Sequence, residues 1–207
     1  MAIKNDREYR DIELREFELK DEDYIVEGYA ALFDKPYVLW EDEDGTYYED
    51  ISSRAFENAD MSDVIFLYNH EGMVYARLSN NTLELNIDDV GIKVRADLSS
   101  TQASRDMYEA IKTGLVTKMS WAFTIREDDY DRKTKTRTVK YVKKVYDVSA
   151  VSIPANPDTS ISARSFIDGV IAKEEAERLE RQKKIQRLEL KLKLGGTNNV
   201  KNDNVRD

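Results

Sequence analysis

The first two-thirds of the chain shows short β-rich segments, which are typical of a mainly β domain. Residues 24–30 are rich in strand-forming side chains and run on into the apolar residues 31–33. Residues 64–68 form a continuous apolar run between polar residues, which indicates a buried strand. Residues 83–98 alternate between apolar and polar side chains on either side of an Asp-Asp-Val-Gly turn. This last pattern predicts a β-hairpin.

The period of the pattern changes after the hairpin. Apolar side chains recur at spacings of three to four over residues 104–112, which predicts an amphipathic helix. Residues 116–125 predict the next strand. A charged loop over 126–135 is then expected to lead to two further strands, at 137–142 and 145–151. Together these elements predict a mainly β domain with flanking helices, in the α+β class.

Three shorter segments connect the predicted elements. Residues 34–36 (DKP) predict a turn, and residues 53–59 suit a short capped helix. The acidic segment 41–45 ends in Asp-Gly, which favours a solvated hairpin tip. A calcium loop is the alternative for this segment, although the ligand spacing of an EF-hand is missing.

The composition shifts at about residue 168. Residues 168–193 hold eight basic and six acidic side chains, whereas the whole chain has a formal charge of −9. The segment predicts a long, charged C-terminal helix over 168–194, with an alternating strand over 188–194 as the alternative. We therefore expect a β domain over 1–167, a helical appendage over 168–194 and a disordered tail over 195–207.

The amino-acid composition excludes several kinds of catalytic and metal site. The 207 residues include no cysteine and one histidine, which excludes disulfides, thiolate nucleophiles, zinc–cysteine sites and multi-histidine metal sites. No cofactor motif is present, so no cofactor is expected. The acidic balance argues against nucleic acid as the primary ligand. The sequence shows no signal peptide and no apolar run of about 18 residues, so we expect a cytosolic protein without a membrane partner.

Three polar residues stand out beside apolar runs. His70 follows the apolar run 64–68, where a scaffold can present a catalytic group, and imidazole suits proton transfer near neutral pH. Ser120 lies within a strand-like segment, and Asp147 interrupts an apolar one. A carboxylate in such surroundings is costly to bury without a partner. Each residue taken alone also fits an ordinary structural role. The G-x-S-x-G motif of α/β-hydrolases is absent around Ser120.

Taken in order, several motifs resemble the prohead (capsid maturation) protease family of tailed bacteriophages, a serine protease family related in fold to herpesvirus assemblin. The resemblance spans roughly residues 24–160. The matching segments are the opening strand GYAALF at 28–33, EDISSRAF at 49–56, VIFLYNHE at 64–71, GI at 91–92, the helix–Gly–strand unit IKTGLVTKMSWAF at 111–123, and DVSAVSIPANP at 147–157.

The chain departs from the family pattern at three positions. Arg54 and Ala122 stand where glycine is usual, and these changes affect packing or turn geometry. Asp147 stands where glutamate is common, which shortens the side chain by one methylene. None of these departures removes a proposed catalytic group.

The resemblance implies an antiparallel β-barrel of the herpesvirus-protease type and a serine endopeptidase with a Ser-His-Asp type triad. Ser120 would be the nucleophile, and His70 would take its proton and return it to the leaving amine. Asp147 would hold the imidazole in the correct tautomer. We expect backbone N–H groups near Ala155 and Asn156 to form the oxyanion hole.

The resemblance also implies the biology. A phage- or prophage-encoded prohead protease would act in the host cytoplasm, inside the procapsid. It would cleave the scaffold portion of the major capsid protein and then itself. The partners implied are the capsid protein and its scaffold region, with a homo-oligomer left open. Two alternatives remain: a non-enzymatic capsid- or scaffold-associated binding protein with the same β domain, and a different β-rich hydrolase.

Overall fold

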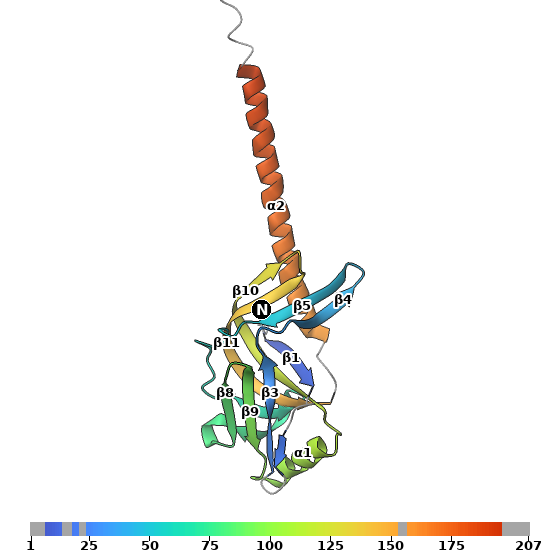
Figure 1. Ribbon diagram of the computed structural model, residues 1–207, viewed down its shortest axis with the longest axis vertical. Coiled ribbons are helices and arrows are strands. Elements are labelled where there is room, and N and C mark those ends of the chain that lie inside the picture. Colours follow the sequence, from blue (N-terminus) through green and yellow to red (C-terminus); the bar gives the residue numbers. More distant parts are fainter. Residues whose placement is uncertain (1–6, 14–17, 21–23, 153–156, 196–207) are drawn as a thin grey trace, which may run out of the picture. The chain divides into compact units, whose positions relative to one another are not determined.

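The computed structural model describes residues 7–13, 18–20, 24–152 and 157–195. These residues form a mainly β structure with two α-helices, as the pattern predicts (Figure 1). The helices are α1 (Gln102–Lys112) and α2 (Pro157–Gly195), and a 3₁₀ turn covers Leu78–Asn80. The strands are β1 (Glu8–Glu13), β2 (Glu18–Lys20), β3 (Ile25–Leu32), β4 (Tyr37–Asp42), β5 (Gly45–Ile51), β6 (Ile65–Tyr68), β7 (Glu71–Arg77), β8 (Leu83–Ile87), β9 (Gly91–Asp97), β10 (Lys118–Asp131) and β11 (Thr136–Val151).

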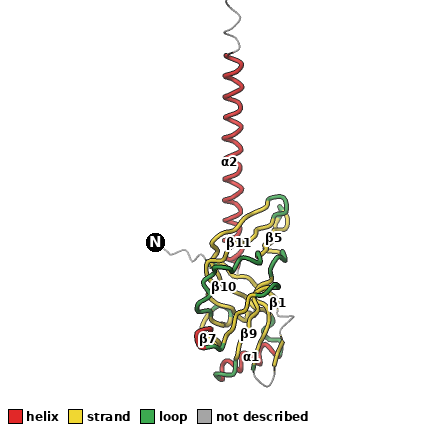
Figure 2. Tube along the Cα trace, turned by 60° about the vertical axis from the view of Figure 1, so that its left-hand side comes forward, coloured by secondary structure: helices red, strands yellow, loops and turns green. Residues whose placement is uncertain are grey.

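The described strands form two sheets. The larger sheet has the order β1-β10-β11-β5-β4, and β6 and β7 join it through β11. The long hairpin of β10 and β11 therefore forms its centre (Figure 2). Both β5 and β6 run parallel to β11, but they pair with different parts of it. The smaller sheet has the order β2-β3-β9-β8 and is antiparallel throughout.

The predicted closed barrel is not confirmed, because the described strands form two separate hydrogen-bonded sheets. Side-chain packing joins the two sheets instead. Residues from both contribute to one hydrophobic core, whose largest fully buried side chains include Trp121, Tyr108, Phe66, Phe123, Ile51, Leu83, Ile92, Leu98 and Met119. Burial of these side chains removes apolar surface from water, which is the main force holding the sheets together.

The predicted hairpin over 83–98 is confirmed as β8 and β9. Gly91 begins β9, opposite Leu32 of β3. A Cβ atom at this position would lie 1.9 Å from the carbonyl oxygen of Ala31, so the close approach of the two backbones requires glycine. The predicted acidic hairpin tip is also confirmed, since β4 and β5 pair on either side of it.

The prediction of a charged loop over 126–135 is wrong. β10 continues to Asp131 and β11 begins at Thr136, so most of the segment belongs to one long hairpin, and β11 is a single strand instead of two. The physical reason is that charged side chains in this part of the β10–β11 hairpin form ion pairs across the two strands. Arg137 Nε donates to Asp128 Oδ2 at 2.8 Å, while Tyr130 and Val139 are buried. A strand can carry charges where cross-strand pairs satisfy them.

The short helix predicted over 53–59 is replaced by consecutive turns. Backbone N–H groups bond to the carbonyl three residues earlier, as in Ala55 to Ser52 at 2.8 Å and Ala59 to Phe56 at 3.2 Å. Bonds of this kind close tight turns, whereas an α-helix needs bonds to the fourth preceding residue.

The C-terminal helix begins earlier than predicted. α2 spans Pro157–Gly195, so the strand alternative for 188–194 is wrong. The chain divides into two compact units, Met1–Arg164 and Ser165–Asp207. Within the second unit, residues 172–192 of α2 are exposed. The predicted tail falls outside the described residues from 196 onward. The described helices include none with the length and apolar character needed to cross a membrane.

Three of the described strands, β1, β2 and β7, are not predicted from the pattern. A buried cluster of charged side chains, here called the ion cluster, fixes β1 to the larger sheet. Arg10 Nη2 of β1 donates to Glu49 Oε2 of β5 at 2.7 Å. Arg137 Nη1 of β11 donates to Glu8 Oε2 of β1 at 2.7 Å, and its Nη2 donates to Asp128 at 2.5 Å. Charged residues can thus form a buried strand when each has a partner.

The helix predicted near 104–112 is confirmed as α1, and its N-cap provides a stability test. The Thr101 side chain accepts a hydrogen bond from the backbone N–H of Ser104 at 3.0 Å. We expect Thr101→Ala to lower the free energy of unfolding by about 1 kcal/mol, because the N–H loses this partner. Urea denaturation measures the change. Thr101→Ser keeps the hydroxyl and should stay near wild type. An equal loss in both variants would contradict the cap as the cause.

Candidate active site

Two neighbouring strands bring a hydroxyl and a carboxylate to the same face of the larger sheet. Ser120 lies on β10 and Asp147 on β11. In the antiparallel register, Ser120 is opposite Ser149 and Ala122 is opposite Asp147. Because opposite residues share a face and every second residue points to the same side, the Ser120, Asp147 and Ser149 side chains lie together.

The imidazole reaches this face from a tight turn. β6 runs parallel to β11, and β6 and β7 form a hairpin that closes at the pair Tyr68 and Glu71. Asn69 and His70 are the two turn residues, with φ of 49° and 63°. Positive φ at both positions is the property of type I′ hairpin turns, in which asparagine is common. This backbone region is uncommon for residues other than glycine, although asparagine and histidine adopt it more often than most.

Hydrogen bonds hold the turn against the end of β11. The Asn69 backbone N–H donates to the Ala150 carbonyl at 3.0 Å, which extends the parallel ladder by one step. The Ser152 backbone N–H donates to Asn69 Oδ1 at 3.1 Å. Left-handed backbone at a residue other than glycine costs free energy and persists where the surrounding structure holds it. The turn therefore fixes the imidazole position at some cost in stability.

The structure brings His70, Ser120 and Asp147 into direct contact. His70 Nδ1 lies 2.6 Å from Asp147 Oδ1, and His70 Nε2 lies 2.7 Å from Ser120 Oγ. The Ser149 hydroxyl donates to Asp147 Oδ1 at 2.8 Å. When a carboxylate, an imidazole and a hydroxyl are linked in this order, the imidazole can accept the proton of the hydroxyl. The hydroxyl would then be able to attack an electrophilic carbon.

The site is largely buried. Ser120 is 0% exposed and Asp147 2%, whereas the His70 side chain keeps 16% of its surface exposed. The Tyr9 ring of β1 packs edge-on against the imidazole, with ring centroids 4.5 Å apart and an interplanar angle of 65°. Low exposure strengthens the electrostatic interactions within the site, because water screens them less.

Sequence reasoning missed three residues around the site. Ser149 could have been found, since it lies two residues beyond Asp147 in a predicted strand and so shares its face. Tyr9 and Asp11 belong to β1, whose mostly charged sequence carries no strand signal. The residues expected near the oxyanion hole, Ala155 and Asn156, lie outside the described residues, and their role stays a prediction.

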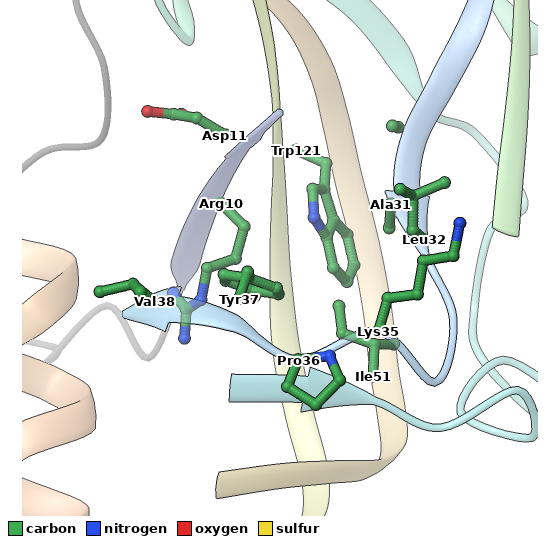
Figure 3. A pocket seen from close by; sticks show the side chains of 11 residues that line it. Arg10, Asp11, Ala31, Leu32, Lys35, Pro36, Tyr37, Val38, Ile51 and Trp121 are labelled. Atoms are coloured by element: carbon green, nitrogen blue, oxygen red, sulfur yellow. The ribbon is translucent and has the colours of Figure 1, made fainter. Parts of the chain in front are cut away.

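A cavity of about 360 Å³ lies on the face of β10 to which Trp121 points (Figure 3). Its walls are mostly apolar. The lining residues are Arg10, Asp11, Ala30, Ala31, Leu32, Lys35, Pro36, Tyr37, Val38, Ile51 and Trp121. Because successive residues of a strand point to opposite faces, Trp121 and Ser120 lie on different sides of β10. Within the described part of the chain, no group of three or more His, Asp or Glu side chains could hold a metal ion.

Comparisons with known proteins agree with the resemblance drawn from the motifs. The chain is similar to the "Prohead protease" of Enterobacteria phage HK97, with 29% identity over 155 residues, 70% of this chain and 62% of the relative. It is 23% identical to the "Prohead protease" of Escherichia phage T5 over 109 residues, 53% of this chain and 50% of that protein. The chain thus spans between half and two-thirds of the length of these relatives. No solved structure matches.

The sequence profile described as "Caudovirus prohead serine protease" matches residues 10–171. The match covers most of the chain and includes residues 10–13 of β1, the β6–β7 turn and the β10–β11 hairpin, which contribute to the site. The chain therefore belongs to the caudovirus prohead serine protease family.

Proposed function

We propose that this protein is a prohead maturation protease, a serine endopeptidase in which Ser120, His70 and Asp147 form the catalytic triad. One observation carries the proposal: the single imidazole of the chain lies 2.7 Å from the Ser120 hydroxyl and 2.6 Å from the Asp147 carboxylate. A nucleophile within hydrogen-bond reach of a base that a third group orients is the arrangement serine proteases use.

Each residue then has a distinct role in peptide hydrolysis. Asp147 accepts a hydrogen bond from His70 Nδ1–H, so Nε2 stays free to take the Ser120 proton. The Ser120 oxygen attacks the scissile carbonyl, and the imidazolium returns its proton to the leaving amine. Ser149 donates to Asp147 and so fixes the carboxylate. Backbone N–H groups near Ala155 and Asn156 would stabilise the oxyanion.

The substrate we propose is the scaffold portion of the major capsid protein. Membership of the family and the names of the two relatives support an activity inside the prohead. The protein would be phage- or prophage-encoded and would act within the procapsid in the host cytoplasm, with the capsid protein and its scaffold region as partners. After capsid cleavage it would cleave itself.

The C-terminal unit belongs to the same proposal. The helical appendage proposed over 168–194 lies within α2, whose residues 172–192 are exposed and mix charged with apolar side chains, including Leu179 and Leu190. Such a helix is suited to packing against scaffold or capsid subunits. Self-cleavage at this appendage would release the protease after maturation.

Co-expression of the full chain with major capsid protein tests the function. We expect intact-mass spectrometry to show a shortened capsid protein and a shortened protease. A fluorophosphonate should modify Ser120, which peptide mapping locates. Because Ser120 is fully buried in the isolated chain, the labelling is carried out on assembled particles, where the proposed substrate is present.

The outcomes separate three functions. Capsid cleavage with Ser120 labelling supports the prohead protease. Labelling of Ser120 without cleavage of assembled capsid protein would indicate a different β-rich hydrolase. The absence of both cleavage and labelling in assembled particles would indicate a binding protein that keeps the β domain without its activity. Either of the last two results would contradict the proposal.

A further inference from the structure

A second carboxylate lies beside the Ser120 hydroxyl. β1 pairs with β10 in an antiparallel register that places Asp11 directly opposite Ser120. Side chains at opposite positions share a face, and their Cβ atoms are about 4.5–5.5 Å apart. Figure 3 shows the Asp11 carboxylate turned away from Trp121. Ser120 directly precedes Trp121 on β10, so its side chain points to the opposite side of the strand from Trp121. The triad therefore has a carboxylate on each side of its imidazole–hydroxyl pair.

Asp11 has an unusual environment for an acidic residue. Its Oδ2 atom is buried and has no hydrogen-bond partner among the described residues. A buried oxygen without a partner loses its interactions with water and gains none in return. Its neighbour Arg10 binds Glu49 and so holds β1 to the sheet. The ion cluster thus helps to keep the backbone of Asp11 opposite Ser120.

The groups around Asp11 show which interactions it makes. Burial raises the pKa of the Asp11 carboxyl above its ordinary value, and interactions with Ser120, His70, Lys118 and Arg10 only partly offset the rise. Lys35 lines the same cavity as Asp11. A carboxyl with a raised pKa stabilises the fold less when it is ionised than when it is protonated. At neutral pH the Asp11 charge therefore lowers the stability of the fold.

We propose that Asp11 is a positioning residue that acts through His70. Its negative charge stabilises the protonated imidazole after Ser120 has released its proton. The charge thereby influences the pH below which His70 is protonated and can no longer act as the base. The inference rests on the proposed protease function and deepens it. Asp147 orients the ring through a direct hydrogen bond, whereas Asp11 acts through space from the Ser120 side.

Nuclear magnetic resonance of the full chain tests the interaction without requiring activity. The chain has one histidine, so its imidazole resonances are unambiguous. We expect Asp11→Asn to move the midpoint of their titration to lower pH by about 0.5–1 unit, because a nearby negative charge favours the protonated ring. The acid limb of the capsid-cleavage rate should move in the same direction. Asp11→Glu keeps the charge and should restore both towards wild type.

Asp89→Asn provides the matched control. Asp89 is exposed in the β8–β9 turn, so solvent screens its charge, and neither midpoint should move. If Asp11→Asn fails to fold, Asp11→Ser removes the same charge and carries the same expectation.

An unchanged imidazole titration in a folded, charge-free Asp11 variant would overturn the role of Asp11, whether or not the protein cleaves capsid. A shifted titration with no cleavage by wild type would support the Asp11–His70 interaction and refute the protease function on which its catalytic meaning depends. The two failures are therefore distinguishable.

Discussion

Ser120→Ala is expected to abolish capsid cleavage while leaving the fold intact. Loss of the nucleophile in a serine protease reduces kcat by on the order of 10⁶-fold. The fold should persist because the Ser120 hydroxyl contacts the His70 ring, and alanine fills nearly the same space in the strand. Intact-mass spectrometry of co-expressed capsid protein measures cleavage, and circular dichroism checks the fold.

His70→Ala should cause a comparable loss, since no other histidine in the chain can replace the base. Residues that act as one unit are not additive, so the double variant should be no slower than either single variant. Ser99→Ala, at an exposed position after β9, provides the control and should cleave normally. Capsid cleavage that survives in Ser120→Ala or His70→Ala would show that the assignment of nucleophile and base is wrong.

The sequence predicted the parts of the fold that depend on local pattern. The β8–β9 hairpin and α1 lie where alternation and helical spacing place them, because each segment buries one side of its own short element. The three candidate site residues came from ordered motifs, and the structure brings them within hydrogen-bond distance. Neither spacing nor composition alone could have placed residues 50 and 77 positions apart in contact.

The rest of the fold depends on partners that are distant in sequence. β1 reads as a charged, exposed segment, yet Glu8 and Arg10 are buried because Glu49 and Arg137 satisfy them. Because the hydrophobic pattern does not predict β1, it also gives no indication that Asp11 of this strand lies beside Ser120. The division into two sheets likewise depends on which strands β11 pairs with along its length. Such long-range pairings leave no periodic signal in one sequence.

Glu49 offers the largest expected effect on stability. Its side chain is fully buried and accepts hydrogen bonds from Arg10, Arg137 and the Tyr37 hydroxyl. These carboxylate contacts matter because the guanidinium groups have left water: burial lowers the pKa of Arg137, yet Glu8 and Glu49 together hold it above its ordinary value. The cluster is therefore balanced only while its negative charges are present.

Glu49→Gln keeps the shape of the side chain but removes the carboxylate that both Arg10 and Arg137 contact, so each buried guanidinium group loses a charged acceptor. We expect the free energy of unfolding to fall by about 3–5 kcal/mol, because removing one member of a buried ion pair leaves its partner's charge less compensated. For a protein of this size, each 1 kcal/mol lowers the melting temperature by roughly 2–4 °C. Urea denaturation followed by circular dichroism measures the change.

Glu57→Gln is the matched control. Glu57 pairs with Arg54 at the surface, where both side chains are largely exposed and solvent already screens their charges, so we expect little change in stability. If Glu49→Gln behaved like this control, the ion cluster would not be what anchors β1. Conversely, a large loss specific to Glu49→Gln would show that buried charge attaches β1, and with it Tyr9 and Asp11, to the strand that carries Ser120.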